Sequence, residues 1–140
     1  MKTIFLILIA CLSLFAMDIP YKEALKKNAK DGKPILLEFH AKWCVLCLEM
    51  EKTVFKNAAV KKELQTNFHF VRIDTDSNQE LFCEGENLLI SDCMQLWDVE
   101  GIPAFAILDK EGKLSHITIG ELDKDSFLNF LNAVKKKWQK

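Results

Sequence analysis

The sequence predicts an α/β domain in which helices flank a central mixed β-sheet on both faces. Residues 35–40 form an apolar run of strand length, and residues 68–74 alternate between apolar and polar side chains. The helical spacing between these two runs implies a crossover, which leaves the two strands parallel. Two further strand-like runs, residues 104–108 and 114–119, are joined by a short turn and therefore add an antiparallel edge.

Three helices are expected before the second strand is complete. The first, over residues 19–30, has apolar side chains at helical spacing and ends at Gly32. The second begins at Trp43, directly after the first strand. The third covers residues 58–64, and Asn57 is a favourable N-cap because its side chain can accept a hydrogen bond from the first helical turn.

The second half of the chain contains a polar segment and two more helices. Residues 75–92 are expected to form an irregular loop. A short helix over residues 94–99 follows, and Gly101 ends it. Asp123 caps the last helix, whose apolar side chains share one face. These side chains are Phe127, Phe130, Leu131, Val134 and Trp138.

Length and charge narrow the class of protein. The chain has 140 residues, which fit one domain, and its 49% hydrophobic and 28% charged residues are ordinary for a globular protein. Nineteen Lys and Arg against twenty Asp and Glu give a net charge of -1. A protein that binds nucleic acid by neutralising phosphates is usually basic, so we expect no nucleic-acid partner.

Residues 1–16 have the pattern of a secretory signal peptide. Lys2 gives a positive start, an apolar stretch follows, and Ala16 is a small residue at which a signal peptidase can cut. The apolar stretch is too short to span a bilayer comfortably. We therefore expect export and a single mature domain over residues 17–140. The alternative is a lipoprotein anchored through Cys11, although apolar residues follow Cys11 where a polar tether is usual.

The mature domain holds four cysteines, Cys44, Cys47, Cys83 and Cys93. An even number in an exported protein suggests disulfides, and three pairings are possible. The two-residue spacing favours a bond between Cys44 and Cys47, which leaves Cys83 with Cys93 as a second, structural disulfide. A zinc site of four cysteines is disfavoured because the second pair does not repeat the short spacing, so we expect no metal.

Two segments of this chain resemble the thioredoxin-like superfamily. Residues 37–47 (LEFHAKWCVLC) resemble its active-site segment, and residues 101–103 (Gly-Ile-Pro), directly before a strand, resemble its cis-proline loop. The resemblance covers residues 19–138 and is strongest to the C-terminal periplasmic domain of DsbD and to small exported proteins such as SoxW. It implies a thioredoxin-like fold. Residues 76–93 depart from plain thioredoxin as a cysteine-bearing insertion before the cis-proline loop.

The resemblance implies that Cys44 and Cys47 are a redox-active disulfide and the catalytic pair. Cys44 at the helix start is the attacking thiolate, which unpaired backbone N–H groups favour, and Cys47 resolves the mixed disulfide. Glu38 is placed under the pair, where a buried carboxyl with a raised pKa can exchange a proton with Cys47. Glu51 matches a second acid of the DsbD-like pattern, and a solvated helix face is its alternative.

The same resemblance places Trp43, Ile102 and Pro103 on the substrate-binding surface. The peptide bond before Pro103 is expected to be cis, and the backbone of Ile102 would pair with an extended substrate segment. The implied partners are oxidised protein substrates and a membrane electron donor of the DsbD or CcdA type. No cofactor is implied, and we expect a monomer.

Together these residues predict an exported, periplasmic thiol:disulfide oxidoreductase that reduces protein disulfides. Val45 and Leu46 supply no charge or hydrogen-bond donor to stabilise the thiolate, which favours a reducing pair over a strongly oxidising one. Two alternatives remain open from the sequence. One is a disulfide oxidase or isomerase with the same residues, and the other is a non-catalytic thioredoxin-fold binding module whose disulfides are only structural.

Overall fold

The computed structural model describes residues 17–140, so the predicted signal peptide and Cys11 lie outside the described residues. The elements in chain order are α1 (Tyr21–Asp31), β1 (Ile35–His40), α2 (Val45–Met50), the π-helical turn η1 (Glu51–Phe55), α3 (Ala58–Asn67), β2 (His69–Asp74), β3 (Glu80–Cys83), β4 (Glu86–Leu89), α4 (Ile90–Leu96), β5 (Ala104–Leu108), β6 (Leu114–Ile119) and α5 (Lys124–Trp138). Within residues 17–140 no helix is both long and apolar enough to cross a membrane.

Four strands form the predicted mixed sheet, in the order β2-β1-β5-β6. β1 and β2 are parallel, with His40 opposite Asp74, whereas β5 runs antiparallel to β1 and β6 runs antiparallel to β5. The crossover through α2 and α3 makes the first pair parallel, and the short turn after β5 makes the last pair antiparallel. The mixed sheet predicted from the sequence is therefore confirmed.

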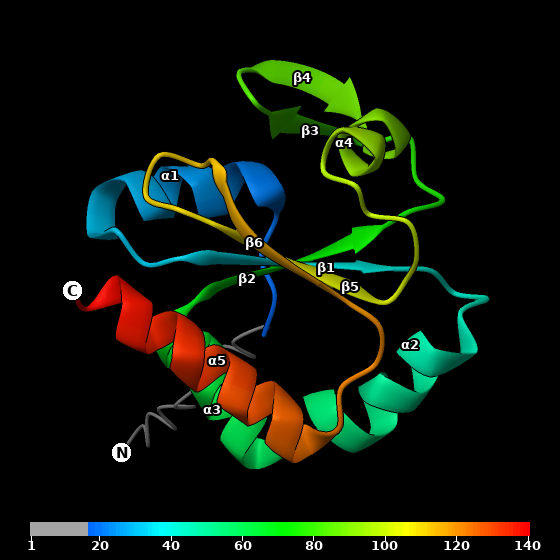
Figure 1. Ribbon diagram of the computed structural model, residues 1–140, viewed down its shortest axis with the longest axis vertical. Helices are drawn as coiled ribbons and strands as arrows, with labels where there is room; N and C mark the ends of the chain where they lie inside the picture. The colour runs from blue at the N-terminus through cyan, green and yellow to red at the C-terminus, as the bar shows by residue number, and fades with distance from the viewer. Residues whose placement is uncertain (1–16) are drawn as a thin grey trace, which may run out of the picture.

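The side chains of β1 alternate between two hydrophobic clusters, one on each face of the sheet. Ile35, Leu37 and Phe39 pack in the cluster under α1 and the β3–β4–α4 segment. Leu36 packs in the cluster formed with α3, α5 and η1. Figure 1 shows this division, with α1 and the β3–β4–α4 segment on one side of the sheet and α2, α3 and α5 on the other. Strict alternation puts Glu38 on the same face as Leu36, under α2 and η1.

The prediction of an irregular loop over residues 75–92 is wrong. β3 and β4 pair as a small antiparallel hairpin, and α4 starts four residues before its predicted start at residue 94. Glu84 (φ 51°) and Gly85 (φ 96°) make its two-residue turn, since both have the positive φ that such tight turns require. Leu81 and Cys83 are buried while their neighbours are exposed. The sequence does not show this alternation, because Phe82 on the exposed side is itself apolar.

The N-cap of α3 matches its prediction and gives a first testable consequence. The Asn57 side chain accepts hydrogen bonds from the backbone N–H groups of Ala59 (2.9 Å) and Val60 (3.3 Å). We expect Asn57→Ala to lower the free energy of unfolding by about 1 kcal/mol, because two donors of the first turn lose their acceptor. Urea denaturation would measure this. Asn57→Ser, which restores a capping oxygen, should recover most of the loss; equal losses would contradict the capping role.

Candidate active site

The two cysteines of the Cys-x-x-Cys segment lie at the edge of the sheet where β1 ends. They form a disulfide whose Cα atoms are 5.2 Å apart. Cys44 is the N-cap of α2, and the backbone N–H of Cys47 donates to its Sγ atom at 3.2 Å. Both residues are almost buried, with exposed fractions of 5% for Cys44 and 3% for Cys47. The sequence predicts Cys44 at the helix start, and the structure makes it the N-cap, so that its sulfur faces the N–H groups of the first turn.

Apolar side chains surround the disulfide on the surface. Trp43 is 66% exposed, Val45 76% and Leu46 44%, although all three are large hydrophobic residues. The indole N–H of Trp43, the residue before Cys44, donates to the Asp76 carboxylate at 2.9 Å, which fixes the orientation of the ring. Exposed apolar side chains that gather at one place are typical of a surface that contacts another protein.

The Ile102–Pro103 segment lies against the cysteines from the other side. Its peptide bond is cis. Ile102 packs on the small cluster formed by Ala41, Cys44 and Cys47. The structure therefore brings Ile102 to the disulfide, although these residues are distant in the sequence.

Glu38 is fully buried on the sheet face under α2 and η1. Burial raises the pKa of its carboxyl to about 7, although the charge and hydrogen bond of Arg72 act in the opposite direction. Glu38 Oε2 accepts a hydrogen bond from Arg72 Nε at 2.7 Å. Glu38 Oε1 is buried and has no hydrogen-bond partner in the described part of the chain. A carboxyl with a free buried oxygen and a pKa near neutrality is suited to accept and release a proton.

Arg72 joins Glu38 to Glu51, and the sequence reasoning missed it. Arg72 Nη2 lies 2.7 Å from Glu51 Oε2, and its guanidinium carbon lies 5.3 Å from the centre of the Phe55 ring. Burial alone would lower the pKa of Arg72, but the two carboxylates raise it, so the guanidinium stays charged. No sequence motif indicates Arg72, because it lies beside Glu38, on the same face of the sheet, only through the register of the parallel strands β1 and β2. The ion pair also shows that Glu51 is only partly solvated.

His40 at the end of β1 does not supply positive charge to the site at neutral pH. Burial and the neighbouring Arg72 charge lower the pKa of its imidazole. A neutral imidazole cannot stabilise a thiolate through charge.

The second disulfide joins Cys83 at the end of β3 to Cys93 in α4, with Cα atoms 6.0 Å apart. Cys83 is 1% exposed and Cys93 is fully buried. Both belong to the hydrophobic cluster between the sheet and the β3–β4–α4 segment, whereas Cys44 and Cys47 form a separate cluster. The structure therefore does not place the two disulfides in one site.

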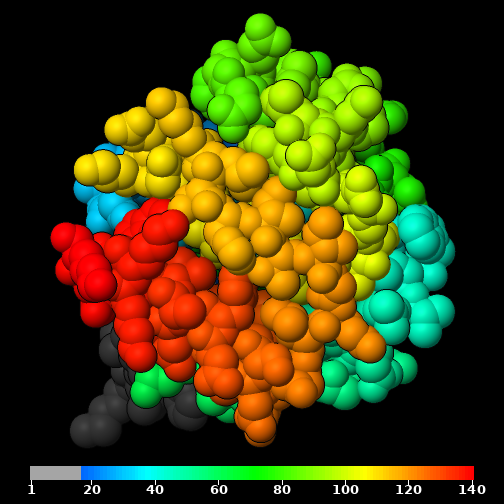
Figure 2. All heavy atoms as spheres, viewed as in Figure 1, coloured from blue at the N-terminus to red at the C-terminus, as the bar shows by residue number. Residues whose placement is uncertain are grey.

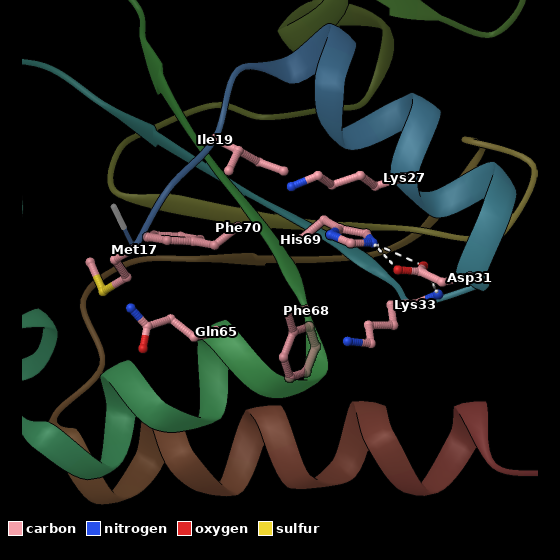
Figure 3. A pocket seen from close by; sticks show the side chains of 9 residues that line it. All are labelled: Met17, Ile19, Lys27, Asp31, Lys33, Gln65, Phe68, His69 and Phe70. Atoms are coloured by element: carbon pink, nitrogen blue, oxygen red, sulfur yellow. Dashed lines mark hydrogen bonds and ion pairs between the residues drawn. The ribbon is translucent and has the colours of Figure 1, made fainter. Parts of the chain in front are cut away.

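A cavity of about 500 Å³ lies at the opposite edge of the sheet, where β1 and β2 begin. Figure 3 shows the His69 ring directed at the Asp31 carboxylate, with Nε2 2.9 Å from Oδ1. This hydrogen bond connects the end of α1 to the start of β2 and so accounts for His69. None of the residues that line this cavity belongs to the cluster around Cys44.

The fold and the disulfide at the helix start define a thioredoxin-like protein. A family model described as thioredoxin-like matches residues 16–110, and the chain belongs to this family. It is 36% identical over 121 residues to the thioredoxin-like protein HCF164, chloroplastic, of Oryza sativa subsp. japonica, which covers 86% of this chain and 40% of the relative. It is 33% identical over 112 residues to the thiol:disulfide interchange protein DsbD of Actinobacillus pleuropneumoniae, covering 78% of this chain and 18% of the relative. The chain thus spans less than half the length of these relatives.

Solved structures show the same fold. A thioredoxin from Thermus thermophilus superposes with a TM-score of 0.67 at 24% identity, covering 85% of this chain and 86% of that one. The oxidised C-terminal domain of DsbD from Neisseria meningitidis superposes with a TM-score of 0.57 at 20% identity, covering 81% and 88%. At these identities the likeness establishes the fold alone.

Proposed function

We propose that this protein is a thiol:disulfide oxidoreductase that reduces disulfides in other proteins. The observation that carries the proposal is the Cys47 N–H directed at Cys44 Sγ from the first turn of α2. When the disulfide opens, the same N–H faces a Cys44 thiolate and stabilises it, which makes Cys44 the nucleophile. The names of two relatives, HCF164 as a thioredoxin-like protein and DsbD as a thiol:disulfide interchange protein, support this class of reaction.

The reaction transfers two electrons from the dithiol to a substrate disulfide. The Cys44 thiolate attacks one substrate sulfur, which forms a mixed disulfide and releases the other substrate sulfur as a thiolate. Cys47 then loses its proton and attacks Cys44 Sγ, which closes the Cys44–Cys47 disulfide and releases the second substrate sulfur. The substrate is reduced to two thiols, and an external dithiol must reduce the protein again.

Glu38 is the proposed acceptor of the Cys47 proton. Its buried position under α2, its free Oε1 atom and its pKa near 7 support this role. Arg72 is a proposed positioning residue, because its guanidinium holds the Glu38 carboxyl group. Glu51 acts one step further away, because it pairs with Arg72. Trp43, Ile102 and Pro103 are proposed to contact the substrate, and the exposure of Trp43 and the packing of Ile102 on the cysteines support this.

Export to the periplasm, with residues 1–16 as a signal peptide, is part of the proposal and rests on the sequence. There the proposed electron donor is a membrane protein of the DsbD or CcdA type. We propose that the protein acts as a monomer on oxidised protein substrates. An alternative anchored through Cys11 would change its attachment but not its chemistry.

The equilibrium redox potential tests the direction of the reaction. We expect a value closer to that of thioredoxin, roughly -270 mV, than to that of DsbA, roughly -120 mV. The reason is that Val45, Leu46 and a neutral His40 add no charge that would stabilise the reduced form. Titration in glutathione buffers, with alkylation and mass spectrometry of the Cys44–Cys47 peptide, would measure it. A potential above about -150 mV would make the protein an oxidase instead.

A further inference from the structure

The loop that contains Ile102 directly follows α4, the helix that the Cys83–Cys93 disulfide joins to β3. Only residues 97–103 separate the end of α4 from β5. In Figure 1 this loop descends from α4 toward the sheet beside the end of β1. Figure 2 shows its yellow-green atoms bordering the cyan atoms of the segment that follows β1. Contacts that fix the position of α4 therefore also restrict the position of this loop.

Three backbone hydrogen bonds connect the loop to α4. The N–H groups of Trp97, Asp98 and Val99 donate to the carbonyls of Cys93 (3.1 Å), Gln95 (3.2 Å) and Met94 (2.8 Å). Asp98 has a φ of 54°, a left-handed conformation that a non-glycine residue adopts at an energetic cost. The surrounding contacts must therefore hold this turn in place.

Two side-chain links connect α4 and the loop to the β3–β4 hairpin. The Cys83–Cys93 disulfide is the first. The second is the indole N–H of Trp97, which donates to Glu84 Oε1 at 3.2 Å, one residue after Cys83. The Trp97 ring also packs edge-on against Phe39 of β1, with ring centres 6.4 Å apart. The hairpin, the helix and the loop are thus braced against each other and against the active-site strand.

Ile102 connects the braced segment to the active site, because it contacts both. It packs against the hydrophobic cluster that contains Cys83, Cys93 and Trp97, and also against the cluster of Cys44 and Cys47. Its position relative to the active-site disulfide therefore depends on both clusters.

We propose that the Cys83–Cys93 disulfide and the Trp97–Glu84 hydrogen bond position the Ile102–Pro103 loop for binding of protein substrates. This inference rests on the proposed function. The Cys83–Cys93 disulfide acts through the loop and exchanges no electrons with the substrate, so it controls the affinity for a protein substrate and not the reactivity of Cys44. A small aromatic disulfide needs no extended docking surface, so its reduction is independent of the loop.

The double variant Cys83→Ala/Cys93→Ala tests this separation. We expect the KM for reduction of insulin to rise about tenfold, because loss of the brace lets the loop depart from the geometry that docks an extended segment. The rate constant with 5,5′-dithiobis(2-nitrobenzoate) should stay within about twofold of the unmodified protein, since Cys44 keeps its helix start. An unchanged KM for insulin, or equal losses with both substrates, would overturn the proposal.

Trp97→Phe provides a test that keeps the second disulfide intact, should the double variant fail to fold. It removes the indole N–H but retains an aromatic ring against Phe39, and we expect the same selective rise in the KM for insulin. Glu84→Gln retains a side-chain oxygen as acceptor and should behave like the unmodified protein. If Trp97→Phe leaves the insulin KM unchanged, the bracing role of Trp97 is wrong.

A destabilised control separates positioning from loss of stability. Leu131→Ala creates a cavity in the cluster under α5, far from the loop, and destabilises the protein without touching Ile102. Its KM for insulin should equal that of the unmodified protein at temperatures where it remains folded. If its KM rises as much as that of the double cysteine variant, the second disulfide only stabilises the fold and the proposal is wrong. If the unmodified protein does not reduce insulin at all, the proposed function fails instead.

Discussion

Cys44→Ser is expected to lower the rate of insulin reduction to that of the chemical reductant alone. Serine fits the space of Cys44, which is 5% exposed, but its hydroxyl cannot attack a disulfide. Turbidity from the precipitating insulin B chain, with dithiothreitol as electron source, would measure the rate. Activity equal to that of the unmodified protein would show that Cys44 is not the nucleophile.

Cys47→Ser is the matched variant, and its expected result is different. Cys44 can still attack the substrate, but no thiol is present to resolve the mixed disulfide, so the covalent adduct accumulates. Non-reducing electrophoresis and mass spectrometry should detect an adduct through Cys44 with insulin chains. No adduct with Cys47→Ser, together with full loss of activity in both variants, would contradict the assigned order of attack. A binding module without catalysis would show neither activity nor adduct in any variant.

The strands that build the sheet could be predicted from the sequence because each has a simple local signal. The apolar run over residues 35–40 predicts a strand with the bounds that β1 has, and the structure accounts for the run by burying this strand on both faces. The hairpin of β3 and β4 was missed because each strand has only four residues and most of their side chains are exposed. Its burial depends on Cys83, Cys93 and the cluster around Trp97, which are tertiary contacts that no local window contains.

The residues of the candidate site also differ in whether the sequence could predict them. The sequence motif was sufficient to predict the cysteine pair, because its chemistry requires two thiols at one helix start. The partner of Glu38 could not be predicted from a motif, because Arg72 lies on another strand and comes beside Glu38 only through the register of β1 and β2. Arg72 also pairs with Glu51, so the Glu51 carboxylate lies beside the Glu38–Arg72 pair and is only partly solvated.

The pH dependence of stability should report the buried Glu38 directly. Its pKa is about 7 in the folded protein, above the ordinary value of 4.5, because burial disfavours the carboxylate. Between these two pH values the folded state holds a proton that the unfolded state has released. The stability that this proton contributes is therefore complete below pH 4.5 and is lost as the pH rises through 7. The loss by pH 8 is of the order of 3 kcal/mol.

Comparison of the unmodified protein with Glu38→Gln isolates this contribution. Urea unfolding of the oxidised protein at pH 5 and pH 8 is the measurement, since disulfide-bonded cysteines do not titrate. His40 acts with the opposite sign, because its pKa is lowered by burial and its contribution is lost as the pH falls, but both proteins contain it. The free energy of unfolding of Glu38→Gln should therefore rise relative to that of the unmodified protein by about 2–3 kcal/mol between pH 5 and pH 8, because a small part of the loss has already occurred at pH 5. A difference that does not change with pH would mean that Glu38 is ionised throughout and paired with Arg72, and would remove it as the proton acceptor for Cys47.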